Sequence, residues 1–385
     1  MRRLLVLTST MVFLDVAVLT AIAPLLPTYV DELGLSKAAA GILSASYAAG
    51  TLIFALPAGY VASRVGPRRT VIGGLLLLGA ASLAFGFARN IYLLDSARLV
   101  QGAAGSLIWS GSITWLITSA PDEERGSMIG FALGTAVAGA LLGPALGAAA
   151  ASIGTGPVFS AVLVVAFGLA FAATRIEDAH APASQSLGEV IRTLLSRPLV
   201  VSAAFVAVPS MMFGAVEVLV PLRIDALGGG HGVIAGGFIV GAGLEAFLAP
   251  FAGRLSDRTG RRLPYVVGLT ICAAAMAAFA LAAALGGVLA ALIVTSLGAG
   301  LCFAPAMTLI SDAAEASDLH QGFAAGVSNM AWASGQVVGG IGGGVVAGLT
   351  GNALPSLLIA AALMATVAYA FRALQSPPQP RPAEG

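Results

Sequence analysis

The chain has 385 residues, of which 58% are hydrophobic and only 10% are charged, and its mean hydropathy is +0.95. A soluble domain carries about 25% charged residues, so this composition excludes a soluble globular protein. It also excludes an intrinsically disordered protein, which needs low hydrophobicity. The formal net charge of +1 indicates no particular partner. The class that remains is a polytopic membrane protein.

Long apolar runs, separated by charged residues or by Gly and Pro, divide the chain into candidate membrane spans. A helix needs about 20 apolar residues to cross a bilayer, and these runs do not alternate as the strands of a transmembrane barrel would. We therefore predict an all-α polytopic protein with twelve transmembrane helices in two pseudo-symmetric bundles. The spans run approximately over residues 4–30, 38–62, 70–88, 91–118, 127–151, 157–174, 199–224, 232–254, 264–285, 288–311, 322–350 and 354–372.

The longest polar interval divides these spans into two groups of six. We predict an N-terminal six-helix bundle over 1–175, a cytoplasmic linker over 176–197, a C-terminal six-helix bundle over 198–373 and a disordered cytoplasmic tail over 374–385. Within the linker, residues 187–195 could form a short surface helix.

The beginning of the chain is similar to a signal peptide, because Arg2 and Arg3 precede an apolar stretch. However, Asp15 interrupts that stretch, and Pro24 would directly follow the cleavage box. We therefore expect an uncleaved first span.

Basic residues orient the chain, because they are retained on the cytoplasmic side of a membrane. With the N-terminus in the cytoplasm, one face carries most of the arginines, whereas the other carries only Lys37, Arg89 and Arg223. We therefore expect a multi-pass protein of the cytoplasmic (inner) membrane with both termini in the cytoplasm.

Sequence patterns of the first half return in the second. The loop 59–69 after the second span is repeated as 253–262 after the eighth, and the glycines of 139–143 in the fifth span are repeated in 335–339 of the eleventh. Two parallel six-span halves are typical of transporters whose site lies at the midplane between them. The loop residues to which we assign a conformational role are Gly59, Ser63, Arg64, Gly66, Arg68 and Arg69, and Gly253, Asp257, Arg258, Gly260, Arg261 and Arg262.

Ionisable side chains inside a span cost about 2.5–3.5 kcal/mol each and usually line a cavity. Asp15 and Glu245 lie near the middle of their spans, and Glu217 lies in the outer half of the seventh. We expect these three carboxylates to bind a proton or a cation in a water-accessible cavity. Arg98 follows Asp95 by one turn in the fourth span. Two interpretations of Arg98 stay open: it belongs to this site, or it forms a fixed salt bridge with Asp15 or Asp95.

Polar and aromatic residues complete the candidate site, because aromatic faces bind cations. Asn329 and Gln336 are seven residues apart and therefore share one helix face. The alternative for the tryptophans is anchoring at the membrane interface or packing, which we favour for Trp115. The remaining candidates are Tyr47, Trp109, Asn329, Trp332 and Gln336.

The fifth span carries small residues four apart at Gly139, Gly143 and Gly147, with Pro144 between them. Such spacing permits close helix contact, and the proline kinks the helix. Gly102 in the fourth span is a further small residue that we include among the conformational motifs. We expect the fifth span to act as a hinge and a seal.

Catalytic motifs are not visible in the sequence. It contains no Walker A loop, nucleophile elbow or zinc-protease helix. Cys272 and Cys302 fall inside apolar runs, with no other metal-ligating residues near them in the sequence. We therefore expect that the protein is not an enzyme and that it needs no cofactor or metal. We expect a proton to be its coupling ion. The expected partners are a small-molecule substrate and the lipid bilayer, and not nucleic acid. We expect the protein to be a monomer.

Taken together, these motifs resemble the major facilitator superfamily, and specifically its twelve-span drug:proton antiporters. Residues 253–262 match that family's loop signature, whereas the first copy has Ser63 where the family has Asp. Arg98 and Gly102 resemble its fourth-span motif, whose Arg is linked to proton coupling. Residues 139–147 resemble the fifth-span motif that is associated with exporters.

A narrower resemblance is to vesicular amine transporters, whose first-span Asp binds the substrate amine. Asp15 and Glu217 match that family's first and seventh spans, which implies that they recognise a cation. Tyr47 and Asn329 stand where that family has Lys and an acid, so its full ionic network is absent.

These observations predict a secondary active transporter that exports a lipophilic small molecule, with a cation favoured, in exchange for protons by alternating access. Two alternatives stay open. One is a proton-coupled importer of a small polar metabolite, and the other is a channel or lipid-handling membrane protein.

Overall fold

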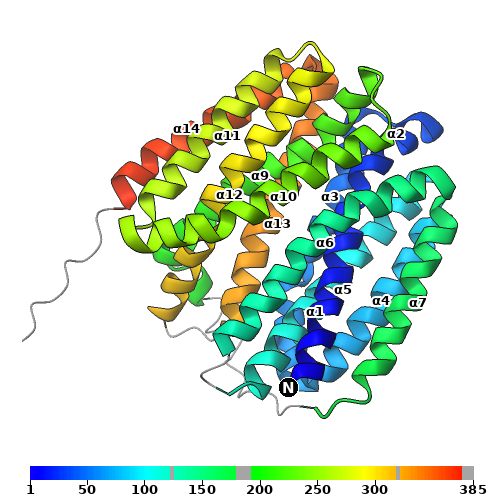
Figure 1. The fold of residues 1–385 in the computed structure, drawn as a ribbon, viewed down its shortest axis with the longest axis vertical. Coiled ribbons are helices and arrows are strands. Elements are labelled where there is room, and N and C mark those ends of the chain that lie inside the picture. The colour runs from blue at the N-terminus through cyan, green and yellow to red at the C-terminus, as the bar shows by residue number, and fades with distance from the viewer. Residues whose placement is uncertain (122–124, 179–191, 318–320, 375–385) are drawn as a thin grey trace, which may run out of the picture.

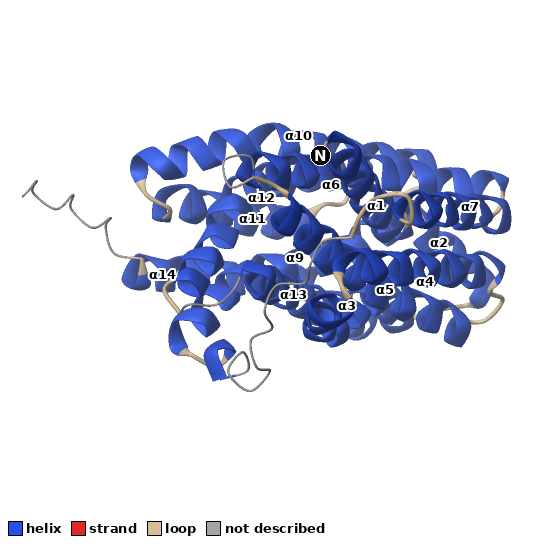
Figure 2. Cartoon of the chain, turned by 90° about the horizontal axis from the view of Figure 1, so that it is seen from below, coloured by secondary structure: helices blue, strands red, loops and turns tan. Residues whose placement is uncertain are grey.

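The computed structural model describes residues 1–121, 125–178, 192–317 and 321–374, and within them the side chains of 125–127, 129, 257 and 321–325 are not described. Every regular element in these ranges is a helix (Figure 2), which confirms the predicted all-α class. The expected surface helix at 187–195 lies mostly outside the described residues, as does the tail after residue 374.

The first half of the chain forms seven labelled helices, which in Figure 1 run from blue to green. Their bounds are α1 Arg2–Thr20, α2 Ile22–Leu33, α3 Lys37–Val65, α4 Pro67–Phe87, α5 Ile91–Ser119, α6 Arg125–Ile153 and α7 Thr155–Ala173.

The second half forms six labelled helices among the described residues. Their bounds are α9 Arg197–Ala226, α10 His231–Thr259, α11 Arg262–Leu281, α12 Leu285–Glu315, α13 Gln321–Thr350 and α14 Ala353–Ala373.

The first predicted span differs from the prediction of one continuous helix, because it consists of two helices. α1 ends at Thr20 and α2 begins at Ile22. Pro24 has no N–H group, so it cannot complete the helical hydrogen bond to the carbonyl of Thr20. The remaining predicted spans each correspond to one helix.

Ten helices or helix pairs of the described part are long and apolar enough to cross a membrane, with α1 and α2 counted together. α5 and α13 are not among them. Both are enclosed by protein on two sides, because α5 packs on α3 and α4, and α13 packs on α9 and α3. A span that is shielded from lipid in this way tolerates more polar and more glycine residues.

The helices gather into two groups that follow the order of the chain (Figure 1). One hydrophobic core is built from α1–α7, with Val218 of α9 added, and the other from α9–α14. The groups meet where α3 packs on α13, α6 on α10, and α2 on both α9 and α10. The boundaries that we predict for two bundles and a linker stay predictions.

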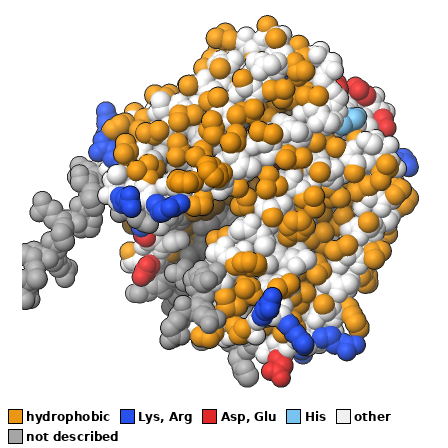
Figure 3. Space-filling view, in the orientation of Figure 1, with side chains coloured by type: hydrophobic (Ala, Val, Ile, Leu, Met, Phe, Trp, Pro, Cys, Tyr) orange, Lys and Arg blue, Asp and Glu red, His pale blue; other side chains and the backbone are white. Residues whose placement is uncertain are grey.

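Hydrophobic side chains cover most of the face shown in Figure 3, and Lys and Arg side chains gather along its left and lower edges. We call the end of the molecule that carries Arg68, Arg175, Arg197, Arg261 and Arg372 the arginine-rich face. The opposite end, with Lys37, Arg89, Arg223 and His231, is the arginine-poor face. An apolar surface between two charged ends is what a bilayer requires.

Candidate functional site

A cavity of about 120 Å³ lies between the two groups of helices. Its wall comes from both halves: α1, α2 and α6 on one side and α9, α10 and α12 on the other. The residues that line it are Thr20, Ala23, Ala140, Pro144, Phe213, Val216, Glu217, Phe238, Ala242, Glu245, Leu292, Thr295 and Ser296. Most of these are apolar, and a few polar groups point to the same space, as in a typical small-molecule site.

Two of the predicted carboxylates line this cavity. Glu217 of α9 accepts a hydrogen bond of 3.4 Å from the hydroxyl of Ser44 on α3, in the other half, and it also interacts with the side chain of Gln336. Glu245 of α10 has neither a hydrogen bond nor an ion pair with any described residue. The hydroxyls of Thr295 and Ser296 lie in the same wall.

Asp15, the third predicted carboxylate, is buried outside the cavity wall. Its Oδ1 atom accepts a hydrogen bond of 2.6 Å from the hydroxyl of Tyr47. Only 6% of Asp15 and 2% of Tyr47 are exposed. The guanidinium of Arg98 lies over the Tyr47 ring, 5.0 Å from its centre. The fold therefore brings together three of the predicted site residues from α1, α3 and α5.

Arg98 binds the backbone of α1 and forms no ion pair with Asp15 or Asp95 among the described residues. It donates to the carbonyls of Val18 at 3.1 Å and Leu19 at 3.0 Å, and to Oε1 of Gln101 at 3.3 Å. These carbonyls belong to the last turn of α1, where a helix leaves acceptors without intrahelical partners. Arg98 is nevertheless close enough to Asp15 and Glu217 to interact with both electrostatically. It therefore connects the buried cluster with the wall of the cavity.

Close packing of α3 and α5 holds Tyr47 in place. A Cβ atom on Gly102, which the sequence analysis singled out, would meet the Tyr47 carbonyl. One on Gly105 would meet both the Tyr47 hydroxyl and Oδ1 of Asp15. Sequence reasoning missed Gly105, although its position three residues after Gly102 puts both on one helix face.

The other predicted site residues are less close to the cavity. Trp109, Asn329 and Trp332 are half-buried and do not line it. Gln336 is 5% exposed, and its Oε1 atom has no hydrogen-bond partner among the described residues. Trp115 is fully buried, so it packs inside the bundle and does not anchor at an interface.

The fifth-span glycines, now in α6, face the junction of α1 and α2. Cβ atoms on Gly139, Gly143 and Gly147 would meet Phe13, Thr20 and Ala21, respectively. Pro144 lines the cavity between them. In the other half, Gly335 and Gly339 of α13 contact α9 in the same way.

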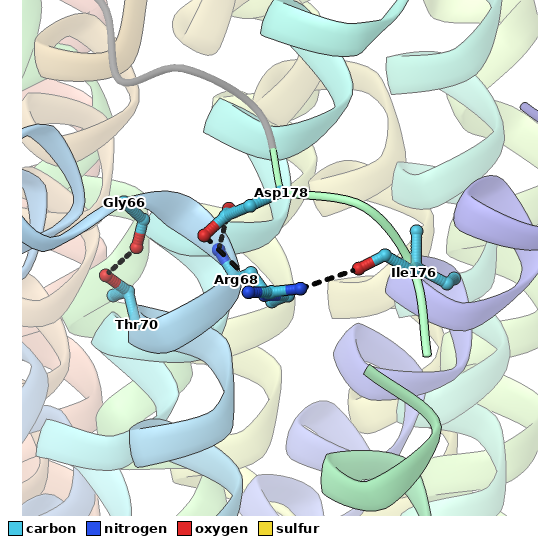
Figure 4. A network of polar contacts seen from close by, with 5 residues as sticks. All are labelled: Gly66, Arg68, Thr70, Ile176 and Asp178. Carbon is cyan, nitrogen blue, oxygen red and sulfur yellow. Dashed lines mark hydrogen bonds and ion pairs between the residues drawn. The ribbon is translucent and has the colours of Figure 1, made fainter. Parts of the chain in front are cut away.

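In the first loop motif, Asp178 contacts Arg68 (Figure 4). Its Oδ1 atom accepts a hydrogen bond of 3.3 Å from the Arg68 backbone N–H, and its Oδ2 atom lies 3.6 Å from Nε of the same residue. Arg68 also donates to the carbonyl of Ile176 at 3.1 Å. Among the described residues, Ser63 donates only to the carbonyl of Tyr60, in its own helix. A carboxylate thus caps α4, but it comes from the segment after α7 and not from the motif.

The second loop motif is held by other partners. Arg261 forms an ion pair with Asp312 of α12, and Arg262 lies over the ring of Phe371, 4.3 Å from its centre. Gly260 has a φ of +81°, as Gly66 has +95° in the first copy. A positive φ favours glycine, and here it ends α10 and α3. The side chain of Asp257 is not among those that the structure describes. Of the other motif residues, Arg64 lies over the Tyr60 ring, and a Cβ atom on Gly253 would meet no described atom within 4 Å. The roles expected for Gly59, Arg69 and Arg258 stay predictions.

Two hydrogen bonds tie the halves together at the arginine-poor face. Nζ of Lys37, at the start of α3, donates to Oδ1 of Asn352, before α14, at 2.8 Å. Nδ1 of His231, at the start of α10, lies 2.8 Å from the carbonyl oxygen of Pro24 in α2. Sequence reasoning named neither pair as a contact, because partners more than 200 residues apart leave no local pattern.

The sequence model described as Major Facilitator Superfamily matches residues 8–340 and 242–385, which together include nearly the whole chain. The chain belongs to the major facilitator superfamily. It is therefore a secondary transporter of a small molecule and a multi-pass membrane protein, and not an enzyme.

Individual relatives agree with this membership. The chain is 29% identical over 368 residues to a chloramphenicol resistance protein of Streptomyces lividans, with 91% of each chain covered. It is 32% identical over 95 residues to the MFS-type transporter ppzB of Metarhizium rileyi, a match that spans 25% of this chain and only 20% of that relative.

Two solved transporters share the fold of this superfamily member. One is a bacterial homologue of the human lysosomal transporter Spinster in an inward-facing, unoccupied conformation, with a TM-score of 0.78, 13% identity and 96% of each chain covered. The other is a D-xylose-proton symporter, with a TM-score of 0.75, 16% identity, and 96% of this chain and 97% of that chain covered. At such low identity they show the fold alone.

Proposed function

We propose that this transporter exports a lipophilic cation in exchange for protons. The observation that carries the proposal is Glu245, whose carboxylate lines the cavity between the halves with no hydrogen bond or ion pair to any described residue. A lone ionised carboxylate is costly in such a place, so it must take up a proton or receive a positive charge from the substrate. The two events exclude each other, which is the physical basis of antiport.

The positions of the three carboxylates suggest a division of roles. Glu217 and Glu245 face the cavity and would receive the cation. Asp15 is enclosed by Tyr47 and Arg98, so it would carry the proton and not contact the substrate directly. Arg98 interacts with both Asp15 and Glu217, and it would couple the two sites. This division departs from the amine-binding role that the vesicular transporter resemblance implies for Asp15.

The size of the cavity supports a change of shape during transport. Its volume of about 120 Å³ is small beside the roughly 300–1,000 Å³ of drug-sized sites. The halves must therefore separate further to admit such a substrate. The hydrogen bonds of Lys37 and His231 close the arginine-poor face, so we infer that the cavity opens first toward the arginine-rich face. We place the arginine-rich face in the cytoplasm and the protein in the inner membrane, as a monomer.

Export is also supported by the drug-resistance name of the relative from Streptomyces lividans. The energy is sufficient: exchange of one proton for one monovalent cation moves no net charge, so a pH gradient supplies about 1.36 kcal/mol per unit. No cofactor enters this proposal.

The test uses purified protein in liposomes with an imposed pH gradient and tetraphenylphosphonium as the probe cation. Wild type should accumulate the probe against its own concentration gradient, driven by the pH gradient, and the uptake should saturate. Glu245→Gln should weaken binding of the probe about tenfold or more, which corresponds to about 1.4 kcal/mol, and should reduce its accumulation. Glu315→Gln, at an exposed acid of α12, is the matched control and should behave as wild type.

Three results would contradict the proposal. A probe flux that does not saturate would indicate a channel. Movement of a polar metabolite together with protons, and none of the cation, would indicate an importer. Equal transport by wild type and Glu245→Gln would remove the role assigned to that carboxylate.

A further inference from the structure

A second hollow lies within the C-terminal half, away from the boundary between the halves. It is an open groove of about 550 Å³ at the arginine-rich face, between the start of α9, the last part of α12 and the end of α14. Its lining includes Arg197, Val201, Phe205, Leu309, Tyr369 and Arg372. None of these residues lines the transport cavity.

The rim of the groove is positively charged. Arg197 and Arg372 are both exposed, and neither forms a hydrogen bond or an ion pair with any described residue. No acidic residue is among the lining. Two guanidinium groups beside one hollow, neither paired with a described residue, attract a phosphate, which each can bind through two parallel hydrogen bonds.

The start of α9 adds to this attraction. Ser196 precedes the helix without capping it, and its hydroxyl oxygen is buried and has no hydrogen-bond partner among the described residues. Pro198, the second residue of the helix, has no N–H group, so the backbone N–H groups of Arg197 and Leu199 are those of the first turn that would favour an anion. α9 is 30 residues long, and its first turn opens at the groove beside Arg197.

The wall below this rim is apolar and aromatic. Val201 and Leu309 line it, together with the rings of Phe205 and Tyr369, whose centres are 5.9 Å apart. Tyr369 is 46% exposed, and half-exposed tyrosines are typical of the membrane interface. A free phosphate would leave this wall in contact with water, whereas an acyl chain would cover it.

We propose that the groove binds an acidic phospholipid from the leaflet on the arginine-rich side. Its phosphate lies between Arg197 and Arg372 at the start of α9, and an acyl chain follows Val201 and Leu309. Basic pockets between helices at the cytoplasmic side are suited to such headgroups. The site is independent of the transport cavity, and the proposal does not rest on the substrate or on the coupling ion.

The test measures lipid retention by native mass spectrometry of the full chain, titrated with phosphatidylglycerol or phosphatidylcholine. Wild type should bind phosphatidylglycerol more tightly than phosphatidylcholine. Each of Arg197→Gln and Arg372→Gln should weaken phosphatidylglycerol binding about fivefold, and the double variant about 30-fold, as expected for one surface charge and for two. Arg175→Gln, at an exposed arginine of the other half, should bind as wild type.

A second variant separates a lipid from a free anion and keeps both arginines. Val201→Trp fills the groove, so it should lose phosphatidylglycerol as the double variant does. Inorganic phosphate added in excess should not displace the lipid. Four results would each overturn the proposal. Wild type could retain both lipids equally, Arg175→Gln could weaken phosphatidylglycerol binding as much as the groove variants do, phosphate could displace the lipid, or Val201→Trp could bind the lipid as wild type does.

Discussion

Tyr47 donates a hydrogen bond of 2.6 Å to Asp15, and this pair joins α3 to α1 inside the first half of the transporter. Both side chains are buried, and the guanidinium of Arg98 covers the tyrosine ring. The Tyr47 hydroxyl can keep this hydrogen bond in both protonation states of Asp15, because a hydroxyl can donate to a carboxylate and accept from a carboxylic acid. The proposed proton site depends on this contact.

Removal of that donor should disturb coupling while the fold persists. Tyr47→Phe deletes the hydroxyl, and a hydrogen bond to a charged group contributes about 1.5–3 kcal/mol. We expect lower pH-driven transport and a lower thermal unfolding temperature. Tyr92→Phe, at a tyrosine that is 81% exposed, serves as the control. Unchanged transport in Tyr47→Phe would show that Asp15 does not need this partner.

Gly105 should be intolerant of a single methyl group. In Gly105→Ala the new Cβ atom would meet the Tyr47 hydroxyl and Oδ1 of Asp15, so it must push the pair apart. We expect loss of pH-driven transport in protein that still reaches the membrane. Gly73→Ala is the comparison, because a Cβ atom there meets nothing and alanine favours a helix by about 1 kcal/mol. Equal activity of the two variants would contradict the packing described for Gly105.

Asp178 should contribute stability that Ser63 does not. Asp178→Ala removes the carboxylate that accepts from the Arg68 backbone N–H, and loss of a cap costs about 1 kcal/mol. Thermal unfolding should therefore occur at a lower temperature than in Glu177→Ala, at an exposed neighbour. Ser63→Ala should have little effect, because its hydroxyl bonds only within α3. A Ser63→Ala variant less stable than Asp178→Ala would reverse this assignment.

The contact between Lys37 and Asn352 should hold the arginine-poor face closed. Lys37→Met keeps the length of the side chain and removes the donor, so the halves should separate more often at this end. Spin labels on α3 and α14, at Ala38→Cys and Leu354→Cys, should then report a longer distance between these helices. The native Cys272 and Cys302 are fully buried, so they should not take up the label.

Arg223→Met is the matched change for that measurement, since Arg223 lies at the same face and donates to Ala282 within its own half. It should leave the distance as in wild type. If both substitutions lengthened the distance equally, the effect would come from lost charge and not from the bond between the halves.

Much of the fold follows from local sequence. The last predicted span, 354–372, corresponds to α14 at Ala353–Ala373, because the length of an apolar run and the charges at its ends are properties of neighbouring residues. The break between α1 and α2 was missed, although Pro24 was visible. A proline in a membrane helix produces a bend or a break depending on how the freed carbonyl is satisfied, and that depends on neighbouring helices.

The candidate site divides in the same way. The residues that are costly inside a membrane, namely Asp15, Glu217, Glu245 and Arg98, can be identified from the sequence alone, since a charge in an apolar run is visible without coordinates. Three contacts could be found only in the folded molecule: Glu217 and Glu245 share a cavity, Arg98 binds the backbone of α1, and Asp178 caps α4. These contacts depend on how each helix is rotated about its axis and on which distant helix it meets, and the packing of the whole chain determines both.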